Sequence, residues 1–287
     1  MNSNSDDRFL NIRKQIVDWL SNHLINTGKA GFVIGLSGGI DSLALALMSR
    51  EATEKCGKDH LTIIFRLDVF DHIHNIRAEE LVSLFNFKCK RINAEKIYQE
   101  VEQALSISED PSFSSSHPTV ITNLRARLMS AMLYFHANLH NLLLLGTMNR
   151  GEFNIGYFTK NASAGDLLPM VNLSKADIRG IAGTYGVPDD IRLRKASASA
   201  CDNTETAEEE WAFTEDELDS MCKMYSEDEL DSRLQASSGA ADPGSMGVNK
   251  NSLILFKSMH RNSEHKRKFY PIFQPKLYRI SPLSGRS

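Results

Sequence analysis

Residues 31–48 read GFVIGLSGGIDSLALALM, and the expected fold follows from this stretch. The apolar run over 31–36 predicts a buried strand, and the leucine- and alanine-rich run over 43–48 predicts a helix. A turn with the sequence Ser37-Gly38-Gly39-Ile40-Asp41-Ser42 joins the two. Because glycines let backbone N–H groups approach a ligand and the helix dipole favours negative charge, this arrangement predicts an anion site.

The acidic side chain of Asp41 indicates which kind of anion site this is. A carboxylate in such a turn would repel a bare phosphate, so Asp41 is better explained as a ligand of a cation that the phosphate shares. No lysine follows the glycines, which excludes the G-x-x-x-x-G-K-[ST] loop of ordinary nucleoside triphosphatases. We therefore expect a nucleotide phosphate to bind here together with a divalent cation.

Strands alternate with helices through the first half of the chain. The apolar pattern predicts further strands over 61–67, 87–92 and 142–146, and helices over 9–25, 73–84 and 123–138. This alternation indicates an α/β fold with a doubly wound parallel sheet flanked by helices. Ligands bind such sheets beyond the carboxyl ends of the strands, so residues 37–42 and 147–152, each directly after a strand, are expected at one rim.

The last third of the chain has a different composition. Residues 202–231 are strongly acidic, which predicts a solvent-exposed helix face. The stretch 236–247 is rich in Ser, Gly, Ala and Pro and predicts a mobile loop. A helix is expected over 251–260, followed by basic residues up to Lys268. We expect the whole chain, residues 1–287, to form a single domain.

The composition excludes several classes of protein. With 41% hydrophobic and 24% charged residues the chain is typical of globular proteins, and its net charge of -3 gives no reason to expect nucleic-acid binding. No apolar run approaches the roughly 20 residues that span a bilayer, and the polar, acidic N-terminus is unlike a secretory signal. Four widely separated cysteines disfavour a disulfide framework or a zinc site. We expect a cytoplasmic protein that binds neither nucleic acid nor membrane.

Six short motifs follow the glycine turn in a defined order. They are NLRAR at 123–127, LGTMNRGE at 145–152, GYFTK at 156–160, DLLP at 166–169, NLSK at 172–175 and SEHKR at 263–267. The glycine turn resembles the S-G-G-x-D-S pyrophosphate loop of the N-type ATP pyrophosphatases. Together, the turn and the six motifs resemble the ammonia-dependent NAD synthetase family over about residues 10–275. Their order and spacing are far more specific than any one motif.

The resemblance implies a ligase that uses ATP as co-substrate and Mg²⁺ as metal. The carboxylate of deamido-NAD would be adenylated with loss of pyrophosphate, and ammonia would then displace AMP to give NAD. The residues outside the resemblance are too few for an amidase domain, so we expect free ammonia, or ammonia delivered by another protein, as the nitrogen source. The family forms homodimers through helices, and the apolar helices expected over 9–25 and 123–138 suit that role.

The resemblance also assigns site residues. The catalytic roles fall on Asp41, Lys175 and Thr147, and the metal ligands are Asp41 and Glu152. The residues expected to contact ATP or its pyrophosphate are Gly35, Ser37, Gly38, Gly39, Asp41, Ser42, Arg127, Thr147 and Lys175. Those expected to contact the acceptor substrate are Arg127, Thr159, Lys160, Asp166, His265 and Lys266.

The surroundings of Lys175 can be predicted from the residues themselves. Ser174 and Asp177 form a capping-box pattern, which predicts a helix that begins at Lys175. A cation in the first turn opposes the helix dipole, so Lys175 needs an anionic partner. The resemblance implies a phosphate of ATP, and the alternative is a lysine that faces solvent.

Two segments depart from the family pattern. Residues 161–165, NASAG, are one residue shorter than the family's segment and lack its acidic residue, and residues 196–199, ASAS, lack an aspartate. Both belong to the region that recognises the acceptor, whereas the motifs on the ATP side match. We expect deamido-NAD as acceptor, with a different carboxylate as the alternative. A third hypothesis is a nucleotide-binding protein without catalysis, but intact Asp41, Glu152 and Lys175 argue against it.

Overall fold

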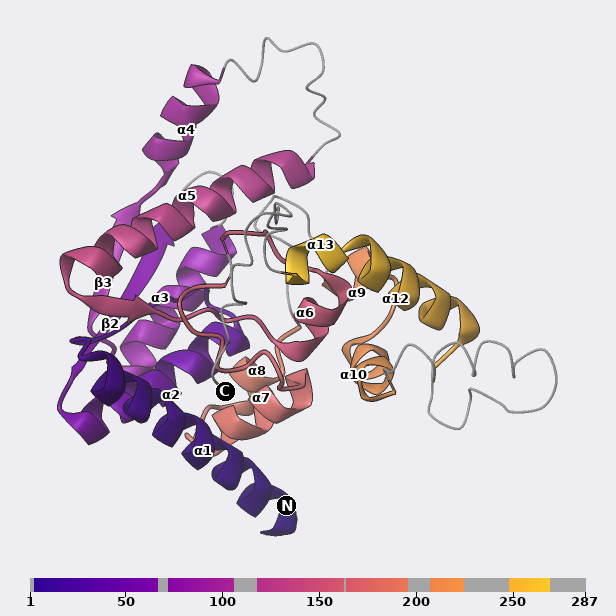
Figure 1. Ribbon diagram of the computed structural model, residues 1–287, viewed down its shortest axis with the longest axis horizontal. Helices are drawn as coiled ribbons and strands as arrows, with labels where there is room; N and C mark the ends of the chain where they lie inside the picture. The colour runs from indigo at the N-terminus through magenta and orange to yellow at the C-terminus, as the bar shows by residue number, and fades with distance from the viewer. Residues whose placement is uncertain are drawn as a thin grey trace, which may run out of the picture.

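The computed structural model describes residues 3–66, 72–105, 118–162, 164–195, 207–224 and 248–268. Within these ranges, four parallel strands form one sheet in the order β3-β2-β1-β4 (Figure 1). The strands are β1 (Gly31–Gly35), β2 (Asp59–Arg66), β3 (Cys89–Asn93) and β4 (Leu142–Leu144). The central strand β1 pairs with β2 on one side and with β4 on the other. The expected α/β fold with a parallel sheet is confirmed.

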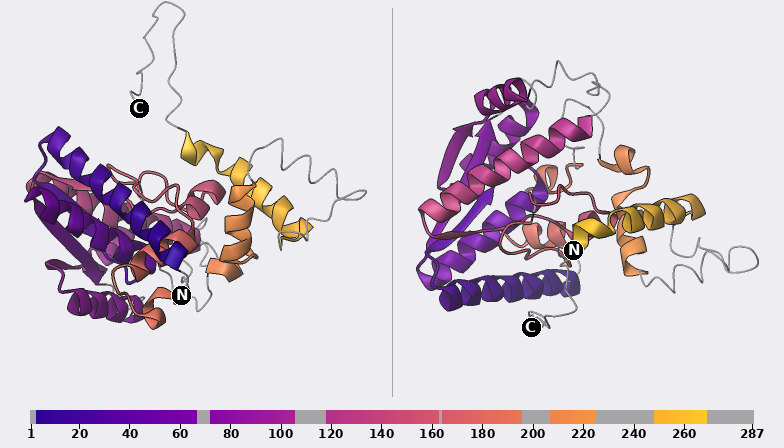
Figure 2. Two further views of the ribbon diagram at one scale, coloured as in Figure 1. Left: turned by 90° about the horizontal axis from the view of Figure 1, so that it is seen from below. Right: turned by 45° about the horizontal axis from the view of Figure 1, so that its top comes forward.

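Helices cover both faces of this sheet. On one face lie α1 (Ser3–Thr27), α2 (Ile40–Cys56), α3 (His72–Phe85), α7 (Lys175–Gly183) and α8 (Asp189–Arg192). On the other lie α4 (Glu95–Ala104) and α5 (Pro118–Leu139), as two views of the ribbon also show (Figures 1 and 2). Alternate residues of β1 explain this division, because Phe32 and Ile34 pack with α2 whereas Val33 packs beneath α5. Helix α2 is buried on most sides, between the sheet, α1 and α7.

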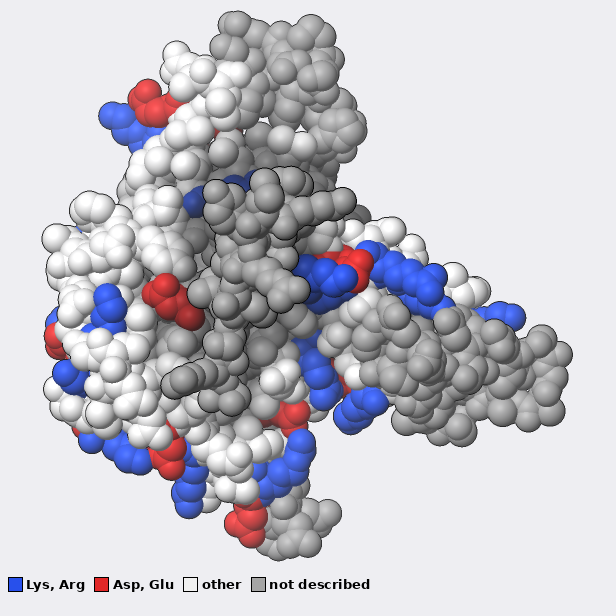
Figure 3. All heavy atoms as spheres, viewed as in Figure 1, with Lys and Arg blue, Asp and Glu red and all other residues white. Residues whose placement is uncertain are grey.

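A second, smaller cluster lies beside the sheet. It is built from α6 (Arg150–Ile155), α9 (Ala207–Trp211), α10 (Glu215–Lys223) and α12 (Lys250–Asn262), and α13 (Glu264–Arg267) follows α12 directly. These helices project from one side of the molecule (Figure 2). Lys and Arg side chains gather over α12 and α13 (Figure 3), where basic residues were expected to follow the helix at 251–260.

The acidic segment differs from its prediction. Helix α10 buries Leu218 and Met221 against α6 and α12, and it also buries the acidic residues Glu215 and Asp219. A solvent-exposed face was expected because the prediction rested on the number of acidic residues and took no account of the apolar residues between them. In the described part of this segment Glu210 and Asp216 are exposed, as expected, whereas Glu215 and Asp219 are buried, contrary to the prediction. The predicted loop at 236–247 and the altered segment at 196–199 lie outside the described residues.

Most predicted elements lie close to their expected bounds, but two helices begin earlier and a third was not predicted. Helix α1 begins at Ser3, six residues before its expected start, and α5 begins at Pro118, five residues before its expected start. Helix α4 was not predicted at all. Helix α4 is mostly polar and was overlooked for that reason, although its few apolar residues, which include Ile97, Tyr98 and Val101, lie at helical spacing on one face. Tyr98 is nevertheless buried against α5, so tertiary packing stabilises this helix.

Candidate active site

The glycine turn forms a tight loop between β1 and α2. Gly38 has a φ of 85°, and a Cβ atom placed there would lie 2.8 Å from the Cβ of Arg77 and 3.0 Å from the backbone nitrogen of Ala78. Only glycine accommodates both the left-handed conformation and this close approach of α3. Gly39 is the N-cap of α2 and offers no side-chain cap. The first backbone N–H groups of α2 thus keep the capacity to bind an anion.

Ser42 braces this loop from within. Its hydroxyl donates to the Gly39 carbonyl at 2.9 Å and accepts from the Ser37 backbone N–H at 3.2 Å. The hydroxyl groups of Ser37 and Ser42 also lie 3.2 Å apart. The side chain of Ser42 is buried, so its part in binding ATP would be to shape the loop through these bonds.

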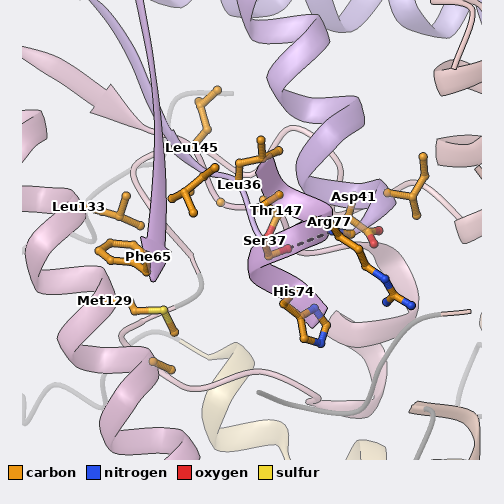
Figure 4. A pocket seen from close by; sticks show the side chains of 18 of the residues that line it. Leu36, Ser37, Asp41, Phe65, His74, Arg77, Met129, Leu133, Leu145 and Thr147 are labelled. Atoms are coloured by element: carbon orange, nitrogen blue, oxygen red, sulfur yellow. Dashed lines mark hydrogen bonds between the residues drawn. The ribbon is translucent and has the colours of Figure 1, made fainter. Parts of the chain in front are cut away.

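A pocket of about 410 Å³ opens at the carboxyl ends of β1 and β4. Eight of the residues that the sequence analysis assigned to ATP or to the metal line this pocket. They are Gly35, Ser37, Gly38, Gly39, Asp41, Thr147, Glu152 and Lys175. Figure 4 shows the polar side chains Ser37, Asp41 and Thr147 at one end and the apolar side chains Phe65, Met129, Leu133 and Leu145 at the other. The pocket therefore offers a polar end for phosphates and an apolar end for a flat ring.

His74 and Arg77 of α3 extend the polar end beyond the sequence assignments. Both line the pocket, and their side chains lie beside the loop in Figure 4. Burial and the charge of Arg77 lower the pKa of His74, and a hydrogen bond with the Ser37 backbone acts in the opposite direction. Arg194 and Lys195 also line the pocket. These residues were missed because they belong to none of the recognised motifs.

Asp41 and Lys175 form an ion pair at the polar end. One carboxylate oxygen of Asp41 accepts a short hydrogen bond from Lys175 Nζ, and the other accepts from Asn149 Nδ2 at 3.1 Å. Lys175 opens α7, where Ser174 and Asp177 form the predicted capping box. Its side chain is only 8% exposed, so it is not a solvent-facing lysine. The predicted anionic partner of Lys175 is, in this structure, the carboxylate of Asp41.

Glu152 brings a second carboxylate to the same end of the pocket. Asn149 caps α6 by accepting from the Glu152 backbone N–H at 3.0 Å, and Glu152 Oε2 accepts from the Asn149 backbone N–H at 3.1 Å. Burial, followed by the charge of Asp41, raises the pKa of Glu152 to about 7, although Lys175 acts to lower it. Asn149 thus links both carboxylates. The N-x-x-E spacing in the sequence is a capping-box signal that could have revealed its role.

Glu215 is a further residue that the sequence reasoning missed. It is the first residue of α10, and its carboxylate lies 2.5 Å from Arg179 Nη2 and 3.9 Å from Lys175 Nζ. The acidic run that contains it carried no motif, so nothing in the sequence distinguished Glu215 from its neighbours.

Five of the six residues expected to contact the acceptor, all except Asp166, form a second group outside the pocket lining. Lys160 Nζ donates to the His265 carbonyl at 2.5 Å, and Lys266 Nζ donates to the carbonyls of Gly156 and Phe158 at 2.8 and 3.0 Å. Burial and the nearby charge of Arg127 lower the pKa of Lys266. The group therefore joins the start of α5, the segment after α6 and helix α13.

Thr159 and Arg127 both interact with Asn123 in this second group. The hydroxyl of Thr159 donates to Asn123 Oδ1 at 2.6 Å, and Arg127 Nη1 donates to the Asn123 carbonyl at 3.4 Å. Ala126, next to Arg127, and Ala162, two residues after Lys160, both line the pocket. The second group therefore borders the cavity that the ATP-side residues line.

Asp166 has a different environment from the other acceptor residues. Its Oδ2 accepts from the Leu144 backbone N–H at 2.8 Å, at the end of β4. Burial, followed by the charge of Asp166 and a hydrogen bond to it, raises the pKa of Tyr134. The carboxylate is thus engaged with the sheet and α5, and it does not line the pocket. The altered segment ends in Gly165, whose φ is 63° and whose added Cβ would lie 2.7 Å from the Leu144 carbonyl oxygen.

Among the described residues, none of the helices has both the length and the apolar character needed to cross a membrane. The same residues contain no group of three or more His, Cys, Asp or Glu side chains placed to hold a metal ion. Asp41 and Glu152 are a pair of carboxylates, which is the usual protein share of a Mg²⁺ site whose other ligands are substrate phosphates and water.

A parallel α/β sheet thus carries a glycine loop, two carboxylates and a lysine at its carboxyl edge. The chain belongs to the NAD synthase family, whose model matches residues 12–270. Members of this family are carbon–nitrogen ligases.

Curated relatives support this assignment along most of the chain. The NH(3)-dependent NAD(+) synthetase of Mycoplasma pneumoniae is 35% identical over 211 residues, which cover 73% of this chain and 81% of that protein. The enzyme of the same name from Aeropyrum pernix is 32% identical over 260 residues, which cover 89% of this chain and 86% of the relative.

Solved structures show the same fold. The NMN synthetase of Francisella tularensis superposes with a TM-score of 0.74 at 30% identity and covers 93% of this chain and 98% of its own. The NH3-dependent NAD synthetase of Campylobacter jejuni gives a TM-score of 0.70 at 20% identity, with 93% and 99% covered. The latter similarity concerns the fold alone.

Proposed function

We propose that this protein joins ammonia to the carboxylate of deamido-NAD at the expense of ATP, giving NAD, AMP and pyrophosphate. The observation that carries the proposal is the convergence of the glycine loop, Asp41, Glu152 and Lys175 on one pocket. A carboxylate is a poor electrophile, so it must be activated before ammonia can attack it. ATP bound at a site for multiply charged phosphates, beside the acceptor site, would supply that activation.

The reaction divides into two displacements. In the first, a carboxylate oxygen of the acceptor attacks the α-phosphorus of ATP, the bond to the β-phosphate breaks, and pyrophosphate leaves. In the second, ammonia attacks the acyl carbon, AMP leaves with the former carboxylate oxygen, and the nitrogen loses a proton to form the amide. Negative charge develops on pyrophosphate in the first step and on AMP in the second.

Backbone N–H groups of the glycine loop and of the first turn of α2 would bind the departing pyrophosphate. Gly38 and Gly39 let the backbone approach, and Ser37 and Ser42 hold the loop in shape. Lys175 would place a positive charge against the phosphates, in exchange for its present partner Asp41. Thr147, at the end of β4, and Gly35 would line the nucleotide site.

Asp41 and Glu152 fit a Mg²⁺ ion. Burial and the proximity of Asp41 penalise the ionised form of Glu152, and a dication would relieve that penalty. When bound, Mg²⁺ would neutralise charge on the phosphates. Asp41 also lies beside the N-terminus of α2, so the ligand and the phosphate loop share one helix.

Arg127, Thr159, Lys160, Asp166, His265 and Lys266 are proposed to contact the acceptor, with α13 contributing the last two. We further propose that the chain forms a single cytoplasmic domain. A homodimer is also proposed, because α1 and α5 expose large apolar side chains, among them Ile25, Phe135 and Leu139.

The test measures pyrophosphate release by the purified protein with ATP, Mg²⁺ and ammonium, with and without deamido-NAD. Release that depends on deamido-NAD, with NAD formed in equal amount, is the expected result. The mononucleotide that carries the same carboxylate as deamido-NAD but lacks its adenylate half is assayed in parallel. It is included because one of the similar solved structures is named an NMN synthetase. Faster turnover of the mononucleotide would contradict the proposed acceptor but not the chemistry.

Asp41→Asn supplies the control for catalysis. It keeps the shape of the side chain but removes the charge that pairs with Lys175, and we expect at least about a hundredfold loss of turnover. Full activity of this variant would contradict the assigned roles of Asp41.

A further inference from the structure

Lys175 lies between carboxylates that come from two different helices. Asp41, in the first turn of α2, accepts its short hydrogen bond, and Glu215, in the first turn of α10, lies 3.9 Å from Nζ. The side chains of Lys175 and Glu215 are 8% and 10% exposed, so neither charge is well solvated. The second carboxylate comes from the acidic segment that the sequence analysis left without a function.

Glu215 is fixed in its position by groups other than Lys175. Its Oε2 lies 2.5 Å from Nη2 of Arg179, which is one helical turn beyond Lys175 on α7. Its backbone N–H donates to Oε1 of Glu208 at 3.0 Å. Because both its carboxylate and its backbone N–H are held in this way, Glu215 can act as a fixed support for a neighbouring charge.

Helix α10 is in turn held against α6, the helix that carries Glu152. A Cβ atom placed on Gly151 would lie 2.7 Å from Cδ2 of Leu218, so the two helices approach as closely as glycine allows. Arg150 and Asp219 form an ion pair between them at 3.4 Å. Glu215 therefore lies at a junction between α6 and α7, which supply Glu152 and Lys175 to the pocket.

The proposed reaction changes the partners of Lys175. Asp41 cannot serve both as a Mg²⁺ ligand and as the main partner of the ammonium group. Burial acts to lower the pKa of Lys175, and the charges of Asp41, Glu152 and Glu215 together outweigh it. Once Asp41 and Glu152 are engaged elsewhere, Glu215 remains to hold the ammonium group in place.

We infer that Glu215 is a positioning residue, which holds the Lys175 ammonium group toward the phosphates of ATP when Asp41 leaves the ion pair. The inference rests on the proposed function, because it assumes that Lys175 contacts ATP. It concerns the orientation of a charge rather than the affinity for the nucleotide. Removing a carboxylate from an anion site should not weaken the binding of ATP, but a misplaced ammonium group should slow its cleavage.

The experiment compares Glu215→Gln with Arg179→Gln, Asp216→Asn and Glu215→Asp. Arg179→Gln breaks the same ion pair but leaves the carboxylate beside Lys175, and Asp216→Asn removes a charge from an exposed position of the same turn. Pyrophosphate release gives kcat and the KM for ATP. Calorimetry with α,β-methylene-ATP and Mg²⁺ gives the affinity without turnover, and thermal unfolding reports on folding.

For Glu215→Gln we expect kcat to fall about tenfold or more while the affinity for the analogue stays within about threefold of wild type. Glu215→Asp should recover part of the loss, and Asp216→Asn should match wild type. Arg179→Gln should lose distinctly less kcat than Glu215→Gln. If Glu215→Gln proves unfolded, a folded Glu215→Asp with lowered kcat and unchanged affinity carries the same conclusion.

Three results would overturn the inference. The first is a wild-type kcat in Glu215→Gln. The second is an equal loss of kcat in Glu215→Gln and Arg179→Gln, which would mean that Glu215 serves only to dock α10 on α7. The third is loss of analogue affinity in parallel with kcat. Wild-type protein that releases no pyrophosphate would overturn the proposed function as well, so the two failures are distinguishable.

Discussion

The side-chain amide of Asn149 donates to Oδ1 of Asp41 at 3.1 Å, across 108 residues of sequence. The same side chain caps α6 and so orients Glu152. One asparagine thus holds the two carboxylates proposed as metal ligands in a fixed relation. Its residue type is essential, because it must donate to Asp41 through nitrogen and accept from α6 through oxygen.

Asn149→Asp is the substitution that separates these two contacts. Aspartate still caps α6, but it places a carboxylate against Asp41 and cannot donate to it. We expect turnover to fall about tenfold to a hundredfold, with a larger loss of activity than of stability. Asn149→Ala, which removes both contacts, should in addition lose about 1 kcal/mol of stability from the cap. Pyrophosphate release and urea unfolding measure the two effects, and an active Asn149→Asp would contradict the role assigned to the donor.

Gly38→Ala tests the close approach at the phosphate loop. Its φ of 85° and the 2.8 Å approach to Arg77 Cβ leave no room for a side chain, so the loop or α3 must move. We expect a loss of about 1–3 kcal/mol in the free energy of unfolding and near-complete loss of activity. Gly57→Ala is the control, since Gly57 has a φ of 64° but meets nothing within 4 Å. An equally inactive Gly57→Ala would show that strain alone, rather than the loop, is responsible.

Lys266→Ala tests the attachment of α13 to the segment after α6. The ammonium group donates to two backbone carbonyls, and hydrogen bonds from charged donors contribute about 1.5–3 kcal/mol each. We expect the KM for the acceptor to rise about tenfold and kcat to change little. Lys268→Ala is the matched control, because Lys268 is 70% exposed and forms a surface ion pair with Glu264. Unchanged KM in Lys266→Ala would remove α13 from the acceptor site.

His60 should make stability depend on pH at a position apart from the residues that line the pocket. Burial, and then the charge of Arg50, lower the pKa of His60 to about 4, below the ordinary value of 6.5. Between these values the unfolded chain binds a proton that the folded protein does not, so the free energy of unfolding falls as the pH falls through this range. The expected loss from this group between pH 7 and pH 5 is about 2 kcal/mol.

The pH experiment compares wild type with His60→Gln by urea unfolding at both pH values. Glutamine does not titrate and can still form a hydrogen bond with Ser49, which lies 2.9 Å from the imidazole. We expect the variant to be less sensitive to acid over this interval. The same pH dependence in both proteins would assign the effect to other groups.

The glycine turn between β1 and α2 could be predicted from the sequence because its requirements are local. A strand, two glycines and a helix start lie within a dozen residues, and the backbone alone makes the anion site. The capping box before Lys175 was predictable for the same reason, since Ser174 and Asp177 are three residues apart. Parallel strands bring their carboxyl ends to one edge, which is why Thr147 and Glu152 were expected beside the loop and line the pocket with it.

Long-range pairings were decided only by the tertiary structure. Three contacts at the site join residues that are far apart in the chain: Lys175 with Asp41, Asn149 with Asp41, and Lys175 with Glu215. Nothing in the local sequence of any of these residues specifies its partner. The carboxylate of Asp166 accepts a hydrogen bond from the Leu144 backbone, because an edge-strand N–H at that point needs a partner, and nothing in the sequence indicated this contact. The sequence by itself determined the glycine turn between β1 and α2 and its place at the carboxyl edge of the sheet. The packing of α6, α7 and α10 decided which charges face one another there, since a buried charge is tolerated only where the folded chain supplies its counter-charge.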